Sequence, residues 1–143
     1  MLISPEARNV TLSTRVNRAN SIQENSCFYL SVHSNAGGGN GFEVFTSPGE
    51  TKSDKIATIF GKEFQKIFPH KKLRSDYSDG DLDKEAAFTV IKETHMPDVL
   101  TERFFMDNEE ECKEILLTKK GRDLIADFHV KAIIRAKSEV FNG

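Results

Sequence analysis

A histidine and a glutamate, far apart in the sequence, are the residues of this chain best suited to hydrolytic chemistry. His33 follows a short apolar run and precedes the glycine-rich stretch 37–41. A neutral imidazole at the end of a strand, beside a flexible loop, is a suitable zinc ligand. Glu102 lies among apolar neighbours, which raise the pKa of a carboxyl group and suit a general base. Two ordinary alternatives remain open, a hydrogen-bonded histidine without a metal and a glutamate paired with Arg103.

Apolar patterning predicts the elements that carry these two residues. Short runs of strand-forming residues predict buried strands over 27–32, 42–46 and 98–102. Apolar residues spaced three or four apart predict amphipathic helices. The predicted helices cover 9–25, 108–117 and 119–137. A further helix is capped by Thr51 or Ser53 and extends to about residue 68, and the segment 84–94 is predicted to be helical or mixed.

Strands alternate with helices through most of the chain, which predicts an α/β fold with a mostly parallel twisted sheet and helices on both faces. Functional residues of such folds gather at the carboxyl ends of the strands. His33 is predicted to end the first strand and Glu102 the third, at one rim of the sheet. We expect their side chains within roughly 6–8 Å, a separation that one metal and one water bridge. The 143 residues suffice for a single domain, 1–143.

Five segments, in order along the chain, resemble the zinc-dependent N-acetylmuramoyl-L-alanine amidases of the type 3 family. Residues 30–36, Leu-Ser-Val-His-Ser-Asn-Ala, are similar to the family's Ser-Ile-His-x-Asn-Ala motif. Residues 96–108 resemble its Pro-Ala-Val-Leu-Val-Glu-x-Gly-Phe-x-Ser-Asn motif. Weaker likenesses lie at 12–20 (Leu-x-x-Arg-x-x-x-Ala-Asn), 41–44 (Gly-x-Glu) and 88–94 (Phe-x-Val-Leu-Arg-x-Thr). Together they cover most of the chain.

The resemblance implies a peptidoglycan hydrolase. The family cleaves the amide between N-acetylmuramic acid and the L-alanine of the stem peptide, with zinc as a Lewis acid. By this resemblance Glu102 is the general base that takes a proton from water, and His33 is the last of three zinc ligands. Asn35 matches a position beside that ligand, where an amide orients the site or meets substrate. The implied partner is peptidoglycan or a muropeptide.

The chain departs from the family pattern in its first residues. The family's other two ligands, a histidine in a Gly-His-Gly loop and a glutamate on the first helix, lie upstream of the part matched here. We therefore expect a fold without the family's first strand and first helix, and an incomplete zinc site. His70, His95, His129 and Glu43 are the candidate replacements, and we expect none to rebuild the site. Phe104 and Asp107 replace the family's Gly and Ser, and Phe104 is expected to add bulk beside the catalytic carboxylate.

Composition excludes several other classes of function. A net charge of −2 gives no reason to expect nucleic acid as a partner. The sequence contains no apolar run long enough for a transmembrane helix, and its first residues do not read as a signal peptide. The location expected for the parent protein, the cell envelope or the exterior, therefore rests on the substrate. Cys27 and Cys112 are expected as free thiols, and exposed sheet edges would favour homo-oligomers.

Three functions remain as hypotheses. The first is an amidase, with this chain alone inactive if its metal site is incomplete. The second is a non-catalytic peptidoglycan-binding module that keeps the amidase fold. The third is an unrelated α/β protein in which His33 and Glu102 are together by coincidence.

Overall fold

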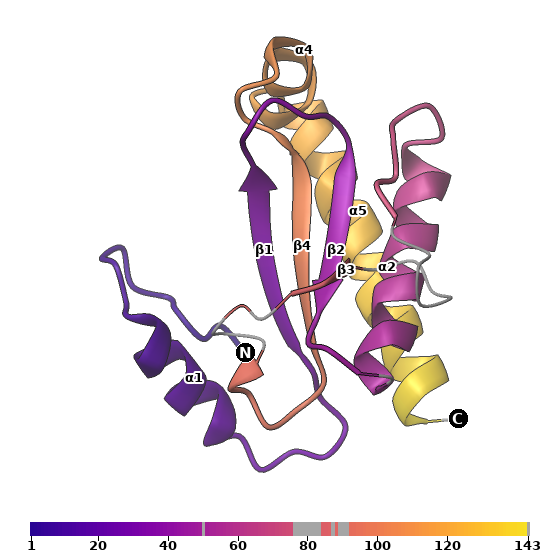
Figure 1. The fold of residues 1–143 in the computed structure, drawn as a ribbon. Coiled ribbons are helices and arrows are strands. Elements are labelled where there is room, and N and C mark those ends of the chain that lie inside the picture. Colours follow the sequence, from indigo (N-terminus) through magenta and orange to yellow (C-terminus); the bar gives the residue numbers. More distant parts are fainter. Residues whose placement is uncertain (50, 76–83, 87, 89–91, 143) are drawn as a thin grey trace.

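A computed structural model describes residues 1–49, 51–75, 84–86, 88 and 92–142 of the chain (Figure 1). A central sheet has two long helices on one face and a short helix on the other. The elements in chain order are α1 (Leu12–Asn20), β1 (Tyr29–Asn35), β2 (Phe42–Thr46), α2 (Lys52–Ile67), β3 (Lys84–Glu85), β4 (Asp98–Phe105), α4 (Glu109–Glu111), the π-helical turn η1 (Cys112–Leu116), α5 (Lys119–Ala136) and the π-helical turn η2 (Lys137–Phe141).

The described sheet has four strands in the order β1-β4-β2-β3. β1 runs parallel to β4 and β2 runs parallel to β3, whereas β2 is antiparallel to β4. The predicted α/β class is confirmed, with one antiparallel pairing inside the sheet. The glycine-rich loop after β1 turns the chain back, and β4 then inserts between β1 and β2. β1 is therefore an edge strand of the described sheet.

Helices lie on both faces of the sheet, but they cover the faces unequally (Figure 1). α2 and α5 pack on one face over the main core. Five phenylalanines in it are fully buried: Phe42, Phe60, Phe64, Phe104 and Phe128. α1 contributes Ala19 to a smaller cluster with Tyr29 and Leu100 on the other face. Part of that second face is left for polar residues.

Caps at the helix starts follow the sequence signals. Of the two caps predicted for α2, Thr51 is the one observed. Its side chain accepts from the Ser53 amide, while Asp54 accepts from the Thr51 amide. Thr118 caps α5 by accepting from the Gly121 amide at 3.0 Å. Each cap satisfies backbone donors that a helix start leaves unpaired, so these helices begin where short polar side chains permit.

Phe104 is the one described non-glycine residue with a positive φ, 59°. It lies within a β-bulge of β4, which has one residue more than β1 between the pairs His33–Glu102 and Asn35–Phe105. Glycine, the residue of the family motif here, adopts this conformation without a steric cost. The expectation that Phe104 crowds the carboxylate is wrong, because the bulge turns its ring into the core against Phe64 and Phe68.

Candidate functional site

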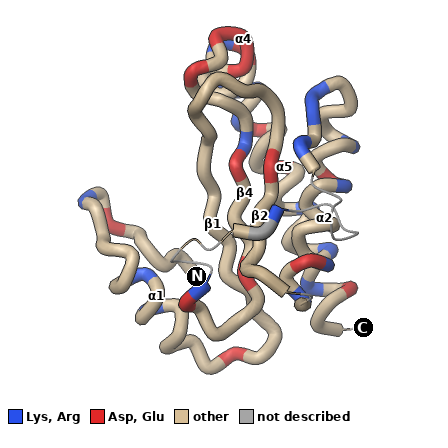
Figure 2. Tube along the Cα trace, in the orientation of Figure 1, with Lys and Arg blue, Asp and Glu red and all other residues tan. Residues whose placement is uncertain are grey.

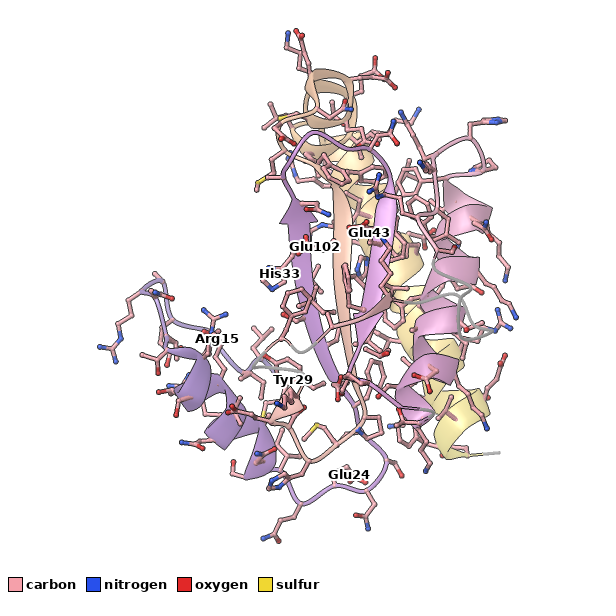
Figure 3. The ribbon with its side chains drawn as sticks, viewed as in Figure 1. Arg15, Glu24, Tyr29, His33, Glu43 and Glu102 are labelled. Atoms are coloured by element: carbon pink, nitrogen blue, oxygen red, sulfur yellow. The ribbon has the colours of Figure 1, made fainter. Side chains whose placement is uncertain are left out.

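Three polar residues form a row across adjacent strands of the sheet. On β4, Glu102 is paired in register with His33 of β1 on one side and with Glu43 of β2 on the other. Paired residues of neighbouring strands point to the same face, with the strands about 4.8 Å apart. The structure thus brings His33 and Glu102 together (Figure 3). Both strands continue past them, to Asn35 and Phe105, so neither residue ends its strand as predicted.

Glu43 is a fully paired carboxylate. Its Oε1 accepts from Arg74 Nε and Lys84 Nζ, both at 2.7 Å, and its Oε2 accepts from Asn35 Nδ2 at 2.6 Å. Burial alone would raise the pKa of Glu43, but hydrogen bonds and charge from Lys84 and Arg74 outweigh it and lower the pKa. Glu43 is therefore a fixed negative charge beside Glu102.

Glu102 differs from its neighbour because the described residues leave its carboxylate unpaired. Its Oε2 atom is buried and has no hydrogen-bond partner among the described residues. Burial raises the pKa of Glu102, the charge of Glu43 raises it further, and Arg103 partly offsets both. The raised pKa matches the sequence expectation, although a neighbouring carboxylate contributes to it as well as burial. A partly desolvated, unpaired carboxyl group is suited to exchanging a proton with a reacting group.

His33 carries a neutral imidazole. Burial lowers the pKa of His33, and the charges of Arg15 and Arg103 lower it further. Its Nε2 lies 2.8 Å from Ser31 Oγ, two residues earlier on the same face of β1. This bond orients the ring beside Glu102. A neutral, oriented imidazole is able to ligate a metal or to accept a hydrogen bond.

Asn35 fixes the position of Glu43, which lies at one end of this row. Its Nδ2 donates to Glu43, and its Oδ1 accepts from the backbone amide of Ala36 at 2.8 Å. Both ends of the amide are thus engaged within the protein. The sequence left two roles open for Asn35, orienting the site or contacting substrate. The geometry supports the orienting role, and contact with substrate remains a prediction.

Two carboxylates that follow β4 hold the glycine-rich loop above the row. Asp107 Oδ2 accepts from the amides of Gly37 and Gly38 at 2.7 and 2.9 Å. Glu111 accepts from the amides of Gly41 and Phe105 at 2.8 and 2.9 Å. Sequence reasoning noted Asp107 only as a departure from the family and missed Glu111, Arg74 and Arg15. No local signal identifies these contacts, because the partners are distant in sequence.

The described residues do not fit a complete zinc site. A catalytic zinc takes three protein ligands and a water, and the described part of the chain contains no group of three His, Cys, Asp or Glu able to hold a metal. His129 lies on the other face, with Nε2 3.1 Å from Thr101 Oγ1 and Nδ1 2.8 Å from the Ile125 carbonyl oxygen. Burial lowers the pKa of His129 to about 4, so it is a packing residue. His95 is exposed and precedes β4.

Comparison with known proteins gives consistent results. A family profile described as N-acetylmuramoyl-L-alanine amidase matches residues 1–135. The amidase CwlM of Bacillus licheniformis is 35% identical over 130 residues, which cover 90% of this chain and 47% of that protein. The sporulation-specific N-acetylmuramoyl-L-alanine amidase of Bacillus subtilis (strain 168) is 33% identical over 108 residues, covering 74% of this chain and 38% of that protein. This chain thus spans less than half the length of these relatives.

Solved structures agree on the fold. The catalytic domain of CwlV, an amidase of Bacillus (Paenibacillus) polymyxa var. colistinus, superposes with a TM-score of 0.77 at 25% identity, over 94% of this chain and 70% of that one. The CwlD amidase of Clostridioides difficile, solved with the GerS lipoprotein, gives 0.75 at 22% identity, over 89% and 61%. Of the five segments that resemble the family motifs, the one at 88–94 lies partly outside the described residues, because 89–91 are not described. The other four segments lie in or next to described strands and helices. The chain therefore belongs to the N-acetylmuramoyl-L-alanine amidase family.

Proposed function

We propose that this chain is the part of a peptidoglycan hydrolase that carries its general base, acting on the amide between N-acetylmuramic acid and L-alanine. Family membership and the names of the relatives support the reaction. The observation that carries the proposal is the juxtaposition of two side chains. Glu102 is a partly buried carboxyl group whose Oε2 has no hydrogen-bond partner in the described part of the chain, and the neutral imidazole of His33 lies beside it. Glu102 is the base and His33 its neighbour at the reacting centre.

The proposed chemistry follows from the unpaired carboxylate. Glu102 accepts a proton from a water whose oxygen attacks the amide carbonyl carbon. When the carbon–nitrogen bond breaks, Glu102 returns that proton to the leaving nitrogen, giving a lactyl carboxylic acid and a free alanine amine. The fixed charge of Glu43 keeps the pKa of Glu102 raised, which strengthens Glu102 as a base. Asn35 keeps Glu43 in place by donating to it.

Zinc is the proposed cofactor of the complete protein, with His33 as one ligand. When bound, zinc would polarise the amide carbonyl and the attacking water. The described residues supply too few ligands for it, so the proposed cofactor requires ligands from further polypeptide. We propose peptidoglycan as the partner, and by its location the cell envelope or the exterior as the place of action. In the described residues no helix is long and apolar enough to cross a lipid bilayer.

One observation favours a second candidate function. Because the described residues hold no three-ligand cluster, the chain by itself would bind peptidoglycan without cutting it. On this alternative the face bearing Asn35 and Glu43 contacts the stem peptide, and Glu102 has no catalytic role.

The test measures cleavage and binding together. A chimera that joins this chain to the part of the CwlV catalytic domain that the chain does not match, and so can supply further ligands, is incubated with peptidoglycan sacculi and an equivalent of zinc. New alanine amino groups are counted alongside the fraction of protein that sediments with the sacculi. Glu102→Gln is expected to reduce amine release by about 10²- to 10⁴-fold. Glu109→Gln is the matched control, since Glu109 is an exposed carboxylate on α4.

The outcomes separate the two candidates. Amine release that Glu102→Gln abolishes and Glu109→Gln preserves supports the hydrolase. Sedimentation without amine release, unchanged by Glu102→Gln, supports the binding module. Cleavage that survives Glu102→Gln contradicts the role of this carboxylate.

A further inference from the structure

Arg15 of α1 lies beside the candidate site, on the face of the sheet that bears His33. α1 packs on this face because its Ala19 clusters with Tyr29, and Tyr29 points to the same side of β1 as His33. Arg15 precedes Ala19 by four residues, about one helical turn, so the two side chains lie on the same side of α1. Figure 3 shows Arg15 and His33 on the same side of β1.

The charge of Arg15 reaches two side chains of β1. Burial raises the pKa of Tyr29, and Arg15 opposes this rise. Burial lowers the pKa of His33, and the charge of Arg15 lowers it further, together with Arg103. Because Coulomb interactions weaken with distance, a guanidinium that acts on both residues lies over the part of β1 between them. At about 3.3 Å per strand residue, the midpoint is roughly 7 Å along β1 from His33.

Neutral groups hold the Arg15 side chain in place. Its Nε donates to the Val10 carbonyl oxygen at 3.0 Å, and its Nη2 donates to Asn9 Oδ1 at 3.3 Å. Among the described residues its Nη1 has no hydrogen-bond partner, and no carboxylate forms an ion pair with Arg15. The donors of a guanidinium form a planar fork that matches a carboxylate. Arg15 is therefore an ordered, half-buried cation that retains donors for an anion.

The cations at the other end of the row are already paired. Arg74 and Lys84 both donate to Glu43, which lies beyond Glu102. Basic segments thus lie on α1 and beside β2, with β1 and β4 between them (Figure 2). Arg15 is the cation that the described residues of this face leave available to an anion from solution.

The proposed reaction indicates which anion that is. In the proposed mechanism the leaving nitrogen lies at Glu102, and the stem peptide continues from that nitrogen. A carboxyl group on the residue after the alanine lies within about 7 Å of the nitrogen in an extended peptide. The sugar side of the uncleaved amide offers hydroxyl and amide groups, whereas the peptide side carries carboxylates. A carboxylate is the group that an arginine fork binds most strongly.

We propose that Arg15 is a specificity-determining residue that binds a free carboxylate on the stem-peptide residue after the alanine. The inference rests on the proposed function, because it assigns a substrate contact to the same site. A stem peptide in which this carboxylate is a neutral carboxamide lacks the ion pair and binds less tightly. The chain therefore selects acidic stem peptides over amidated ones.

Two synthetic muropeptides that differ in one group test the inference by binding alone. Each is N-acetylmuramoyl-L-alanine extended by one residue, whose α-carboxyl group is either free or amidated. Both are titrated into this chain with a chelator and without zinc, and the shifts of backbone amide resonances give the dissociation constants. We expect the acid to bind about tenfold more tightly than the amide. This preference should decrease as salt is added.

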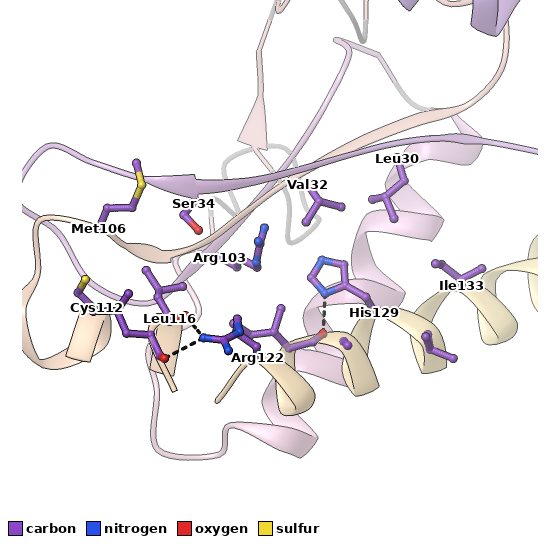
Figure 4. A pocket seen from close by; sticks show the side chains of 14 residues that line it. Leu30, Val32, Ser34, Arg103, Met106, Cys112, Leu116, Arg122, His129 and Ile133 are labelled. Carbon is purple, nitrogen blue, oxygen red and sulfur yellow. Dashed lines mark hydrogen bonds between the residues drawn. The ribbon is translucent and has the colours of Figure 1, made fainter. Parts of the chain in front are cut away.

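Variants identify the cation. Arg15→Gln should weaken binding of the acid about tenfold and leave binding of the amide unchanged, whereas Arg15→Lys should retain part of the preference. Arg122→Gln is the matched control, because Arg122 also donates to neutral groups, the carbonyl oxygens of Leu116 and Leu117. It lines a mostly apolar groove of about 680 Å³ between β1 and α5, on the opposite face of the sheet (Figure 4). Arg122→Gln should change neither affinity.

The outcomes separate this inference from the proposed function. Equal affinity of the unmodified chain for the two muropeptides overturns the inference and leaves the proposed function standing. This comparison needs no variant, so it holds even if Arg15→Gln fails to fold. A chain that binds neither muropeptide contradicts peptidoglycan as the partner and the inference with it.

Two further results would overturn the role of Arg15 alone. One is a preference for the acid that survives Arg15→Gln, since another cation would then make the contact. The other is binding of N-acetylmuramic acid by itself with the same dependence on Arg15, since the cation would then serve the lactyl carboxylate of the product.

Discussion

The two halves of the sheet differ in how completely their polar and apolar groups are satisfied. On the β2 side, Glu43 has three side-chain donors, and the phenylalanines beneath it pack against α2 and α5. On the β1 side, Glu102 Oε2 and Arg103 Nε are buried without hydrogen-bond partners among the described residues. The outer edge of β1 is unpaired in the described sheet, and a mostly apolar groove lies between β1 and α5. Glu102 and Arg103 are consecutive residues of β4, so their side chains lie on opposite faces of the sheet.

This difference assigns a separate role to each half. The β2 side is built for stability, because its charges and apolar surface find their partners within the chain. The β1 side keeps groups that cost free energy in isolation. Such groups are retained where a substrate or another polypeptide supplies the missing contacts. We therefore expect mutations on the β2 side to affect stability and those on the β1 side to affect cleavage.

The largest expected effect on stability compares two residues of α5. Phe128 is fully buried and contacts Phe42, Phe64 and Phe68. Phe128→Ala should lower the free energy of unfolding by about 3–5 kcal/mol, as measured by denaturant titration. Val130→Ala, on the exposed rim of the groove, should change it by less than about 0.5 kcal/mol. An equal loss for Val130→Ala would show that the groove is already filled in solution and would break the comparison.

A second comparison uses the neighbouring carboxylates. Glu43→Gln leaves the Arg74 and Lys84 side chains without their acceptor charge, and we expect a loss of about 1–3 kcal/mol in unfolding free energy. Glu102→Gln removes an unpaired buried charge and should leave stability unchanged or raise it. Thermal melts of both variants at neutral pH measure the difference. A destabilised Glu102→Gln would mean that Glu102 has a structural partner.

A third prediction concerns Asp98, the buried carboxyl group at the other end of β4. Burial raises the pKa of Asp98 from 3.8 to about 6; hydrogen bonds from Ser47 oppose this rise, and the charge of Asp54 adds to it. The folded state therefore holds this proton more tightly than the unfolded chain. The stabilisation is complete below pH 3.8 and is lost as the pH rises to about 6. In Asp98→Asn the free energy of unfolding should depend less on pH within this window. If it falls with pH as steeply as in the unmodified chain, Asp98 is not the group responsible.

The smallest expected effect tests the loop above the site. Asp107→Ser removes the carboxylate that accepts from Gly37 and Gly38. We expect a small decrease in Tm and faster hydrogen exchange of these two amides. Asp123→Ser is the control, because Asp123 is an exposed carboxylate of α5 that pairs with Lys119 one helical turn away. Exchange rates that match those of the control would show that the loop holds its shape without Asp107.

Local patterns predicted most of the fold. The strand at 42–46 was predicted with the bounds it has, and α2 begins after Thr51 and ends before Pro69 as expected. Such features depend on neighbours three or four residues away, so periodicity and capping residues reveal them. The strand of His33 was predicted to begin two residues before it does and to end before Asn35, and the strand of Glu102 was predicted to end three residues before it does. Their last residues depend on hydrogen bonds across the bulge, such as that from the Met106 amide to the Asn35 carbonyl oxygen.

The sequence by itself determined which residue types are available for chemistry, an imidazole in one strand and a carboxylate in another, and the family to which they belong. Only the tertiary structure decided that Glu43 stands beside Glu102 and is paired with Arg74 and Lys84, while Glu102 Oε2 has no hydrogen-bond partner among the described residues. It likewise decided that Phe104 fills the core and that Arg103 lines an open groove. The physical reason is that burial and charge at a residue are set by neighbours across strands, whose identity depends on strand order and register rather than on adjacent sequence.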